Sequence, residues 1–270
     1  MFFVKDMMAC SEAYKRPYNQ DRYFCMNLNC GPDRRNRISI LAVMDGVSRA
    51  NGGEASAMAE SAMRPILLEL LGKCDDLKDL DSETRKDEIL RIMRNAILVA
   101  DRELCRHREG NQIYGTTITL AVVYWDRIYT ANVGDSPAYL LPVSLTGAVS
   151  APIPLFECQN RAGEMVRAGV MTMEEAVALK LQNQLTCMAG GDQLLERDIY
   201  TTSTWLRQSC LLMLGSDGAL SVMPEKELQA IVQEQLCDGL KAVVEGIFAR
   251  VQDSSSTDNF TVLSHWLEQS

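Results

Sequence analysis

The sequence contains only two histidines, His107 and His265, among its 270 residues. Its nine cysteines form no Cys-x-x-Cys pair, and their odd number favours reduced, mostly buried thiols over disulfides or a zinc site. The sequence therefore offers few residues for a mechanism that depends on histidine bases, histidine ligands or cysteine-bound zinc. If the protein is an enzyme, carboxylates must carry its chemistry.

Long apolar runs and excess positive charge are also missing. The longest apolar stretch, residues 116–125, has the length of a strand, and the first residues show no charged segment followed by a long apolar one, so export is not expected. The net charge of −9 argues against nucleic acid and anionic membrane as partners, because both reward clusters of lysine and arginine. We expect a cytoplasmic, monomeric protein whose acidic side chains attract cations.

Hydrophobic spacing predicts an α+β protein with largely antiparallel sheets. Apolar runs bounded by Gly, Asp and Asn predict strands at 38–44, 116–125, 127–133, 138–143, 209–215 and 260–266. Apolar residues three and four apart predict helices at 53–71, 84–108, 223–236 and 238–252, with a kink or break at Pro65. No flexible linker or repeat is evident, which favours one domain over residues 1–270, with a surface segment inserted between strands at about 156–190.

Four acids recur at the ends of predicted strands. Asp45, Asp135 and Asp217 follow strands, and Asp258 directly precedes the last one. Neighbouring antiparallel strands end and begin at the same edge of a sheet, so these acids can gather there, where they would repel each other unless a cation sat among them. An all-oxygen set suits Mg²⁺ or Mn²⁺. The alternative is four independent turns, because Asp and Gly favour turns for local reasons.

Six short motifs in order resemble the metal-dependent protein phosphatase family of the 2C type, in its bacterial form. They are RPYNQDRY (16–23), LAVMDGV (41–47), GTTITLAVV (115–123), ANVGDSPAYL (131–140), LLMLGSDGAL (211–220) and DNFTVL (258–263). Each motif is weak by itself, whereas their common order and spacing are specific. The resemblance implies a four-layer αββα sandwich, in which two antiparallel sheets are flanked by helix pairs, and it implies that the inserted segment at about 156–190 is a flap.

The resemblance also implies roles for particular residues. Asp45 would bridge two Mg²⁺ or Mn²⁺ ions, the carbonyl of Gly46 would bind one of them, and Asp217 and Asp258 would complete the other. Asp135 would hold a weaker third ion together with Asp217. Asp21 would act through metal-bound water, and Arg16 would bind the substrate phosphate, for which its planar fork is suited.

Three positions depart from the family pattern. The loop after Asp45-Gly46 reads Val-Ser-Arg-Ala-Asn (47–51) where members carry glycines and, in some, a histidine proposed as the general acid. Gln20 stands where glutamate is common. Pro137 replaces the arginine of the Gly-Asp-Ser-Arg motif, which puts the geometry of a third ion in question.

The expected function is hydrolysis of phosphoserine and phosphothreonine in proteins by a metal-bridging hydroxide, with a place in signalling. A related reading is a member that acts on a phosphorylated regulator of a sigma-factor pathway. A catalytically weak or silent protein that binds phosphorylated regulators remains an alternative, because of Pro137 and the 47–51 loop. A metal-dependent nuclease or phosphodiesterase is disfavoured by the acidic charge balance.

Overall fold

Two antiparallel sheets packed face to face form the centre of the molecule. The computed structural model describes residues 2–30, 36–108, 110 and 112–269. One sheet has the order β1-β10-β9-β6-β7 and the other β2-β3-β4-β5-β8. Their strands are β1 (Phe2–Glu12), β2 (Arg22–Cys30), β3 (Asn36–Met44), β4 (Ile118–Tyr124), β5 (Arg127–Val133), β6 (Ala138–Pro142), β7 (Ile153–Pro154), β8 (Tyr200–Trp205), β9 (Cys210–Gly215) and β10 (Phe260–Gln269).

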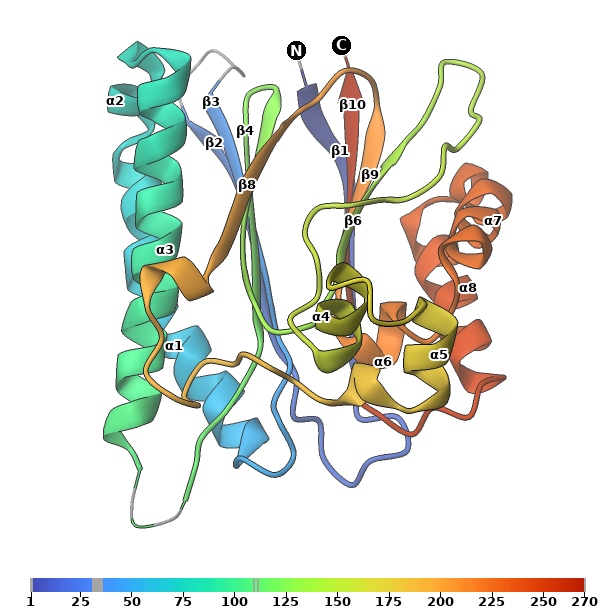
Figure 1. Cartoon of the computed structure of the whole chain (residues 1–270). Helices are drawn as coiled ribbons and strands as arrows, with labels where there is room; N and C mark the ends of the chain where they lie inside the picture. The colour runs from blue at the N-terminus through green and yellow to red at the C-terminus, as the bar shows by residue number, and fades with distance from the viewer. Residues whose placement is uncertain (1, 31–35, 109, 111, 270) are drawn as a thin grey trace.

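Helices cover the outer face of each sheet, so the molecule has four layers (Figure 1). The β2–β8 sheet is covered by α1 (Gly52–Gly72), α2 (Cys74–Asp79) and α3 (Ser82–Arg106), and the other sheet by α7 (Glu225–Gln235) and α8 (Leu240–Gln252). The expected αββα sandwich is thus confirmed. Helix α1 continues through Pro65, so of the kink or break expected there, the break is wrong.

Three apolar cores hold the layers together. One lies between the first helices and their sheet, a second between α7, α8 and the other sheet, and a third between the two sheets, where Leu41 and Val43 of β3 meet Leu212 and Leu263. Both inner strands β4 and β5 are buried along their full length. Because this packing fixes β3, β9 and β10, the residues at the ends of these strands also have defined positions.

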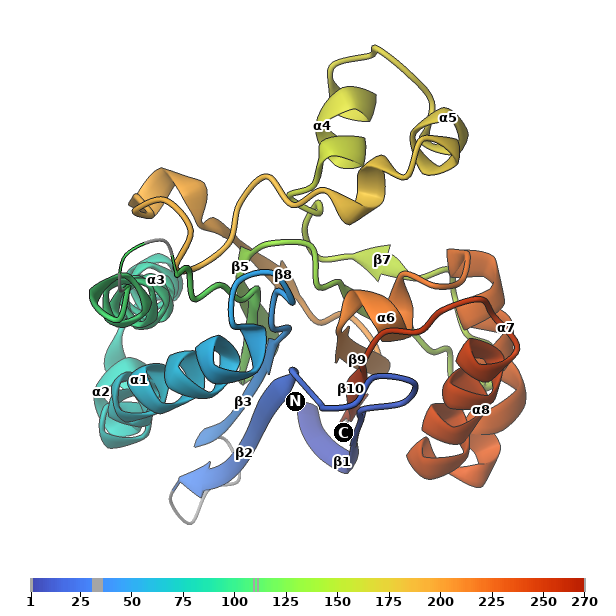
Figure 2. The ribbon, with the colours of Figure 1, turned by 90° about the horizontal axis from the view of Figure 1, so that it is seen from below.

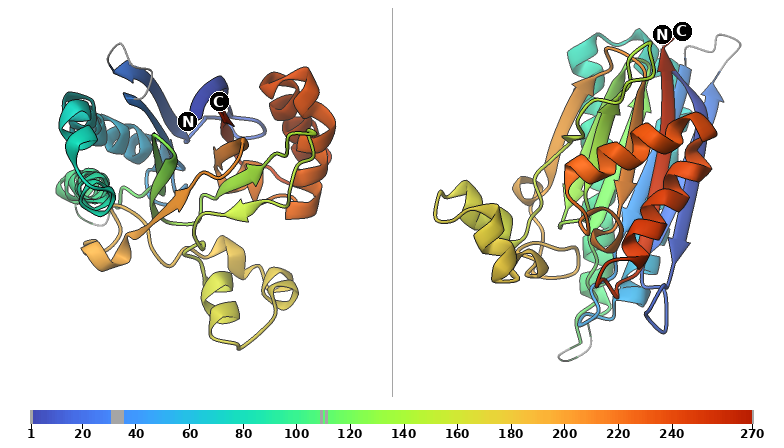
Figure 3. Two further views of the ribbon diagram at one scale, coloured as in Figure 1. Left: turned by 90° about the horizontal axis from the view of Figure 1, so that it is seen from above. Right: turned by 90° about the vertical axis from the view of Figure 1, so that its right-hand side faces the viewer.

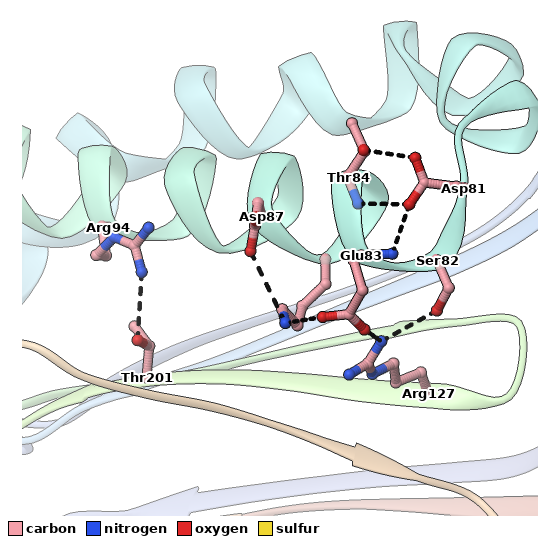
Figure 4. Close-up of polar contacts among 9 residues, drawn as sticks. Asp81, Ser82, Glu83, Thr84, Asp87, Arg94, Arg127 and Thr201 are labelled. Carbon is pink, nitrogen blue, oxygen red and sulfur yellow. Dashed lines mark hydrogen bonds and ion pairs between the residues drawn. The ribbon is translucent and has the colours of Figure 1, made fainter.

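Helix α3 is anchored to its sheet by polar contacts along one side (Figure 4). Asp81 caps its first turn by accepting hydrogen bonds from the amides of Glu83 and Thr84. Glu83 pairs with Arg127 of β5, and Arg94 donates to Thr201 of β8 at 3.3 Å. These contacts fix α3 against its sheet.

A small helical segment projects from the sandwich (Figure 2). It contains α4 (Arg161–Arg167), α5 (Met173–Ala178) and the 3₁₀ turn at Leu181–Asn183, and it leaves and rejoins the body beside the short helix α6 (Asp217–Leu220). Asn160 and Thr172 cap its two helices. Figure 3 shows α4 and α5 standing apart from the α7–α8 layer.

The eight cysteine side chains that the structure describes are free thiols, while the side chain of Cys30 lies outside the described part. In the described ranges, every helix is too short or too polar to cross a membrane.

Candidate active site

The first two acids meet where β2 begins and β3 ends. Asp21 directly precedes β2 and Asp45 directly follows β3, and the two strands pair antiparallel with Arg22 opposite Met44. The backbone of Asp45 is fixed from β4, because its amide donates to Thr117 Oγ1 at 3.0 Å and its carbonyl accepts from the amide of Thr117 at 2.8 Å. The sheet register alone therefore places these two acids side by side.

The other acids come from the ends of β5, β9 and β10. Asp135 follows β5, and Asp217 begins α6 directly after β9 and Ser216. Asp258 precedes β10, whose Val262 lies opposite Gly215 at the end of β9. Asp21 and Asp135 are buried, with 1% and 6% exposure, whereas Asp45, Asp217 and Asp258 are half-buried and retain access to solvent.

The acids perturb each other electrostatically. The pKa of Asp45 is raised well above its usual value, first by its removal from water and then by the charges of three other acids, Asp21, Asp217 and Asp135. Burial, followed by the charge of Asp217, raises the pKa of Asp135 to about 7. The pKa of Asp217 is raised by burial and then by the charge of Asp258. The strand-end acids therefore share one electrostatic environment, which independent turns would not produce.

Asp21 keeps one free acceptor in this environment. Burial raises its pKa to about 6, against a hydrogen bond from Thr261 that lowers it. Thr261 Oγ1 donates to Asp21 Oδ2 at 2.7 Å, while the buried Oδ1 has no hydrogen-bond partner among the described residues. A buried acceptor without a partner is rare in proteins and indicates a place where water or a cation binds.

These residues fit divalent cations. Among the described residues, no three His, Cys, Asp or Glu side chains are placed to surround a single ion. Mg²⁺ is usually held by one or two carboxylates and keeps several waters, so a complete protein cage is not needed. The donors that are present are oxygens only, they are partly accessible, and their charges repel each other until a cation neutralises them.

Gly46 sits where no side chain fits. A Cβ atom there would lie 2.4 Å from the backbone of Gly52 and 2.6 Å from the carbonyl oxygen of Gln20. Ser56 Oγ of α1 also donates to the carbonyl of Gln20 at 2.6 Å. The backbone of the Asp45-Gly46 turn is thus packed directly against the start of α1 and against Gln20. The turn also brings the Asp45 carboxylate into the acidic cluster.

The loop that departs from the family pattern is held by its own contacts. Asn51 adopts a left-handed conformation (φ 46°), which asparagine tolerates better than most residues, and its Nδ2 donates to the carbonyl of Ile113 at 3.0 Å. Ser48 Oγ donates to Gln20 Oε1 at 2.8 Å. Two departures from the pattern, at Ser48 and Gln20, therefore contact each other.

Arg16 contacts one of the acids directly. Its Nη2 donates to Asp258 Oδ2 at 2.9 Å, in a pair whose two side chains are both about 40% exposed (37% and 41%). The loop that carries Arg16 is tied to Asn259, a residue for which the sequence suggested no role although it lies in a quoted motif. Thr261 was missed in the same way, because only the fold brings it to Asp21.

Asp135 lies against the first residues of the projecting segment. Cys158 Sγ donates to the Asp135 carbonyl at 3.3 Å, and Asn160 stabilises its carboxylate. Gln159 exchanges hydrogen bonds with Gly134 and donates to the carbonyl of Asp198, beside a cavity of about 530 Å³ between α4 and residues 185–198. Pro137 is buried, and its carbonyl accepts from Gly215 at 3.1 Å.

The sandwich and its acidic cluster define an α+β protein whose strand ends form a cation-attracting, oxygen-lined site. The protein phosphatase 2C family model matches residues 5–146, which is more than half of the chain. The chain therefore belongs to the protein phosphatase 2C family.

Relatives and solved structures agree with this assignment. The serine/threonine phosphatase stp of Listeria monocytogenes is 26% identical over 234 residues, covering 86% of this chain and 85% of the relative. The structure of the serine/threonine phosphatase Stp1 from Staphylococcus aureus matches with a TM-score of 0.76 at 19% identity, over 99% of this chain and 96% of that one. The catalytic domain of the serine/threonine protein phosphatase PstP, in complex with two manganese ions, matches over the whole of both chains with a TM-score of 0.71 at 19% identity. These structural matches show the fold.

Proposed function

We propose that this chain is a metal-dependent protein phosphatase that removes phosphate from phosphoserine and phosphothreonine in proteins. Family membership and the serine/threonine phosphatases among its relatives support the enzyme class. The observation that carries the metal dependence is the shared electrostatic environment of Asp21, Asp45, Asp135 and Asp217 at one end of the sandwich. When these acids are ionised, a bound cation relieves their mutual repulsion.

In this proposal Asp45, the Gly46 carbonyl, Asp217 and Asp258 hold two Mg²⁺ or Mn²⁺ ions, and Asp135 with Asp217 holds a third, weaker one. Bound divalent cations supply an activated water near neutral pH and neutralise the phosphoryl oxygens. The half-buried Asp45 and Asp217 remain within reach of a ligand from solvent. Asp135 is buried. The charge of Asp217 contributes to the raised pKa of Asp135, which supports a shared ion between the two carboxylates.

Two further residues act on the substrate and on water. Arg16 exchanges its bond with Asp258 for the phosphate, to which its fork can donate two charge-assisted hydrogen bonds. Asp21 offers its Oδ1, which has no partner among the described residues, to a water from which the carboxylate can accept a proton. Thr261 keeps that carboxylate in place through Oδ2.

The remaining features are proposed at a coarser level. The partner is a phosphorylated protein substrate met in the cytoplasm, and the chain acts as one catalytic domain and as a monomer. Residues 156–190 form a flap that borders the site through the Cys158–Asn160 contacts with the Asp135 turn. Nucleic acid and membrane are not expected partners, given the net charge of −9.

Phosphate release from a phosphothreonine peptide tests the proposal. Purified protein with Mn²⁺ is expected to release phosphate, EDTA to stop the release, and added Mn²⁺ or Mg²⁺ to restore it. Absence of any metal-dependent release, together with retained binding of a phosphopeptide, would instead support the silent binding protein.

A further inference from the structure

Asn259 is a buried residue, 3% exposed, whose side chain binds backbone groups of one distant loop. Its Oδ1 accepts from the amide of Gln20 at 3.0 Å. Its Nδ2 donates to the carbonyls of Ala13 and Tyr18, also at 3.0 Å each. The side-chain amide of Asn259 therefore uses both its NH₂ group and its carbonyl oxygen in hydrogen bonds to residues about 240 positions away in the sequence.

The loop that Asn259 binds is irregular, and contacts with other parts of the molecule hold it in place. Residues 13–21 lie between β1 and β2 and form no regular secondary structure. Within this segment the only backbone hydrogen bond recorded among described residues joins the Arg16 amide to the Ala13 carbonyl at 3.0 Å. The three groups bound by Asn259 lie on both sides of Arg16, so they determine where the start of its side chain sits.

The same residue also fixes the acid that Arg16 touches. The backbone amide of Asn259 donates to Asp258 Oδ1 at 2.9 Å, while Arg16 Nη2 donates to Asp258 Oδ2 at 2.9 Å. We propose that Asn259 is a positioning residue for Arg16: its side-chain amide clamps the 13–20 loop so that the guanidinium is held over the acidic cluster. This inference rests on the proposed function, in which Arg16 binds the substrate phosphate.

Asparagine suits this task because one loop needs both a donor pair and an acceptor. An aspartate at 259 would turn an acceptor-only oxygen toward the carbonyls of Ala13 and Tyr18, and alanine or serine would leave backbone groups of the loop without partners. A purely structural residue would affect stability alone. A positioning residue also changes phosphate binding, and it does so only while Arg16 is present.

The first experiment is a double-mutant cycle of Asn259→Ala and Arg16→Ala. We expect Asn259→Ala to raise the KM for a phosphopeptide and the inhibition constant of inorganic phosphate about tenfold each, with kcat changed by less than about threefold. In the Arg16→Ala background the same substitution should add less than about a twofold effect, because the side chain it positions is gone. Equal losses in both backgrounds would overturn the inference.

The second experiment needs no turnover and no metal. Hydrogen exchange of the metal-free protein should show faster exchange of the Gln20 amide in Asn259→Ala, with the Asp45–Gly46 turn unaffected. Ser39→Ala is the matched control, since it also removes a buried side-chain hydrogen bond, to Asn27, but far from the loop. It should leave Gln20 exchange unchanged. Unaltered Gln20 exchange in Asn259→Ala would contradict the clamp.

Two precautions keep the outcomes distinct. If Asn259→Ala does not fold, Asn259→Ser, which keeps a short polar side chain, is used in the same cycle. If the wild type releases no phosphate, the proposed function fails; the inference is then judged on Gln20 exchange and on calorimetric binding of inorganic phosphate in the presence of Mn²⁺, which Asn259→Ala should weaken.

Discussion

Thr261 Oγ1 of β10 donates a 2.7 Å hydrogen bond to Asp21 Oδ2 at the start of β2, and so joins the two sheets beside the acidic cluster. Ser11 Oγ of β1 lies 2.8 Å from the same hydroxyl, and Asn19 Nδ2 donates to Ser11 at 2.8 Å. A chain of polar side chains therefore links the two sheets where the site is built.

We expect Thr261→Val to lower the free energy of unfolding by about 1–3 kcal/mol, because the buried Asp21 carboxylate would lose its bonded donor. Urea unfolding of the metal-free protein measures this. Thr130→Val is the matched control: Thr130 is equally buried, in β5, and its hydroxyl has no partner among the described residues. It should be neutral or stabilising. A similar loss in both variants would show that the bond to Asp21 contributes nothing specific.

Asp45→Asn and Asp217→Asn should lower metal-dependent turnover at least about 100-fold, since a charge stabilisation of several kcal/mol is lost. The same substitutions should stabilise the metal-free protein by about 1–2 kcal/mol, because they remove a repelled carboxylate. Phosphate release and thermal unfolding in EDTA measure the two effects. Asp126→Asn, on an exposed turn, removes the same charge and should change neither. Full activity of Asp45→Asn would exclude the proposed ligand.

The stability of the metal-free protein should fall as pH rises from about 4 to about 7. The pKa values of Asp21 and Asp135 are raised to about 6 and about 7, against about 3.9 in the unfolded chain, so the folded state binds the extra protons in this window. Each group contributes a slope of up to about 1.4 kcal/mol per pH unit. Added Mn²⁺ should stabilise the protein more at pH 8 than at pH 6, since protons compete with the ion. Urea titrations from pH 4 to 8 test both signs, and rising stability would contradict the first.

Gly46→Ala should disrupt the site and the fold together. The new Cβ would meet the backbone of Gly52 at 2.4 Å, and backbone cannot move aside as a side chain can. We expect a loss of at least about 2 kcal/mol, measured by thermal unfolding. Gly72→Ala is the control, because it lies at the end of α1 with nothing within 4 Å of the added atom. It should be neutral or slightly stabilising.

Local sequence patterns predicted much of the sandwich. All six expected strands are present, as β3, β4, β5, β6, β9 and β10, because their apolar runs are buried by the layers around them. Two of the strands that were missed, β1 and β8, lack an uninterrupted buried run. In β1, Lys5 and Asp6 interrupt the pattern at an outer strand with a register shift, and β8 is rich in threonine and only partly buried.

The candidate site was predictable to the extent that its residues stand at strand ends. Asp45, Asp135 and Asp217 could be grouped because each follows an apolar run, and neighbouring strands end together. Asn259 and Thr261 could not be assigned roles, since their partners Gln20 and Asp21 lie about 240 residues away and only the pairing of β10 between β1 and β9 brings them close. Helix α1 passes Pro65 because packing of Met63 and Leu67 against the sheet outweighs one lost hydrogen bond.

The pairing of β1 with β10 has a consequence during synthesis. β10 is the last strand that the structure describes, it lies between β1 and β9, and it is preceded by Asp258 and Asn259. A nascent chain whose residues 258–269 are still inside the ribosome therefore lacks an acid of the cluster and the anchor of the Arg16 loop. β1 stays without its partner strand until a segment some 250 residues downstream has been synthesised, so the phosphatase can reach its working form only after translation has passed β10.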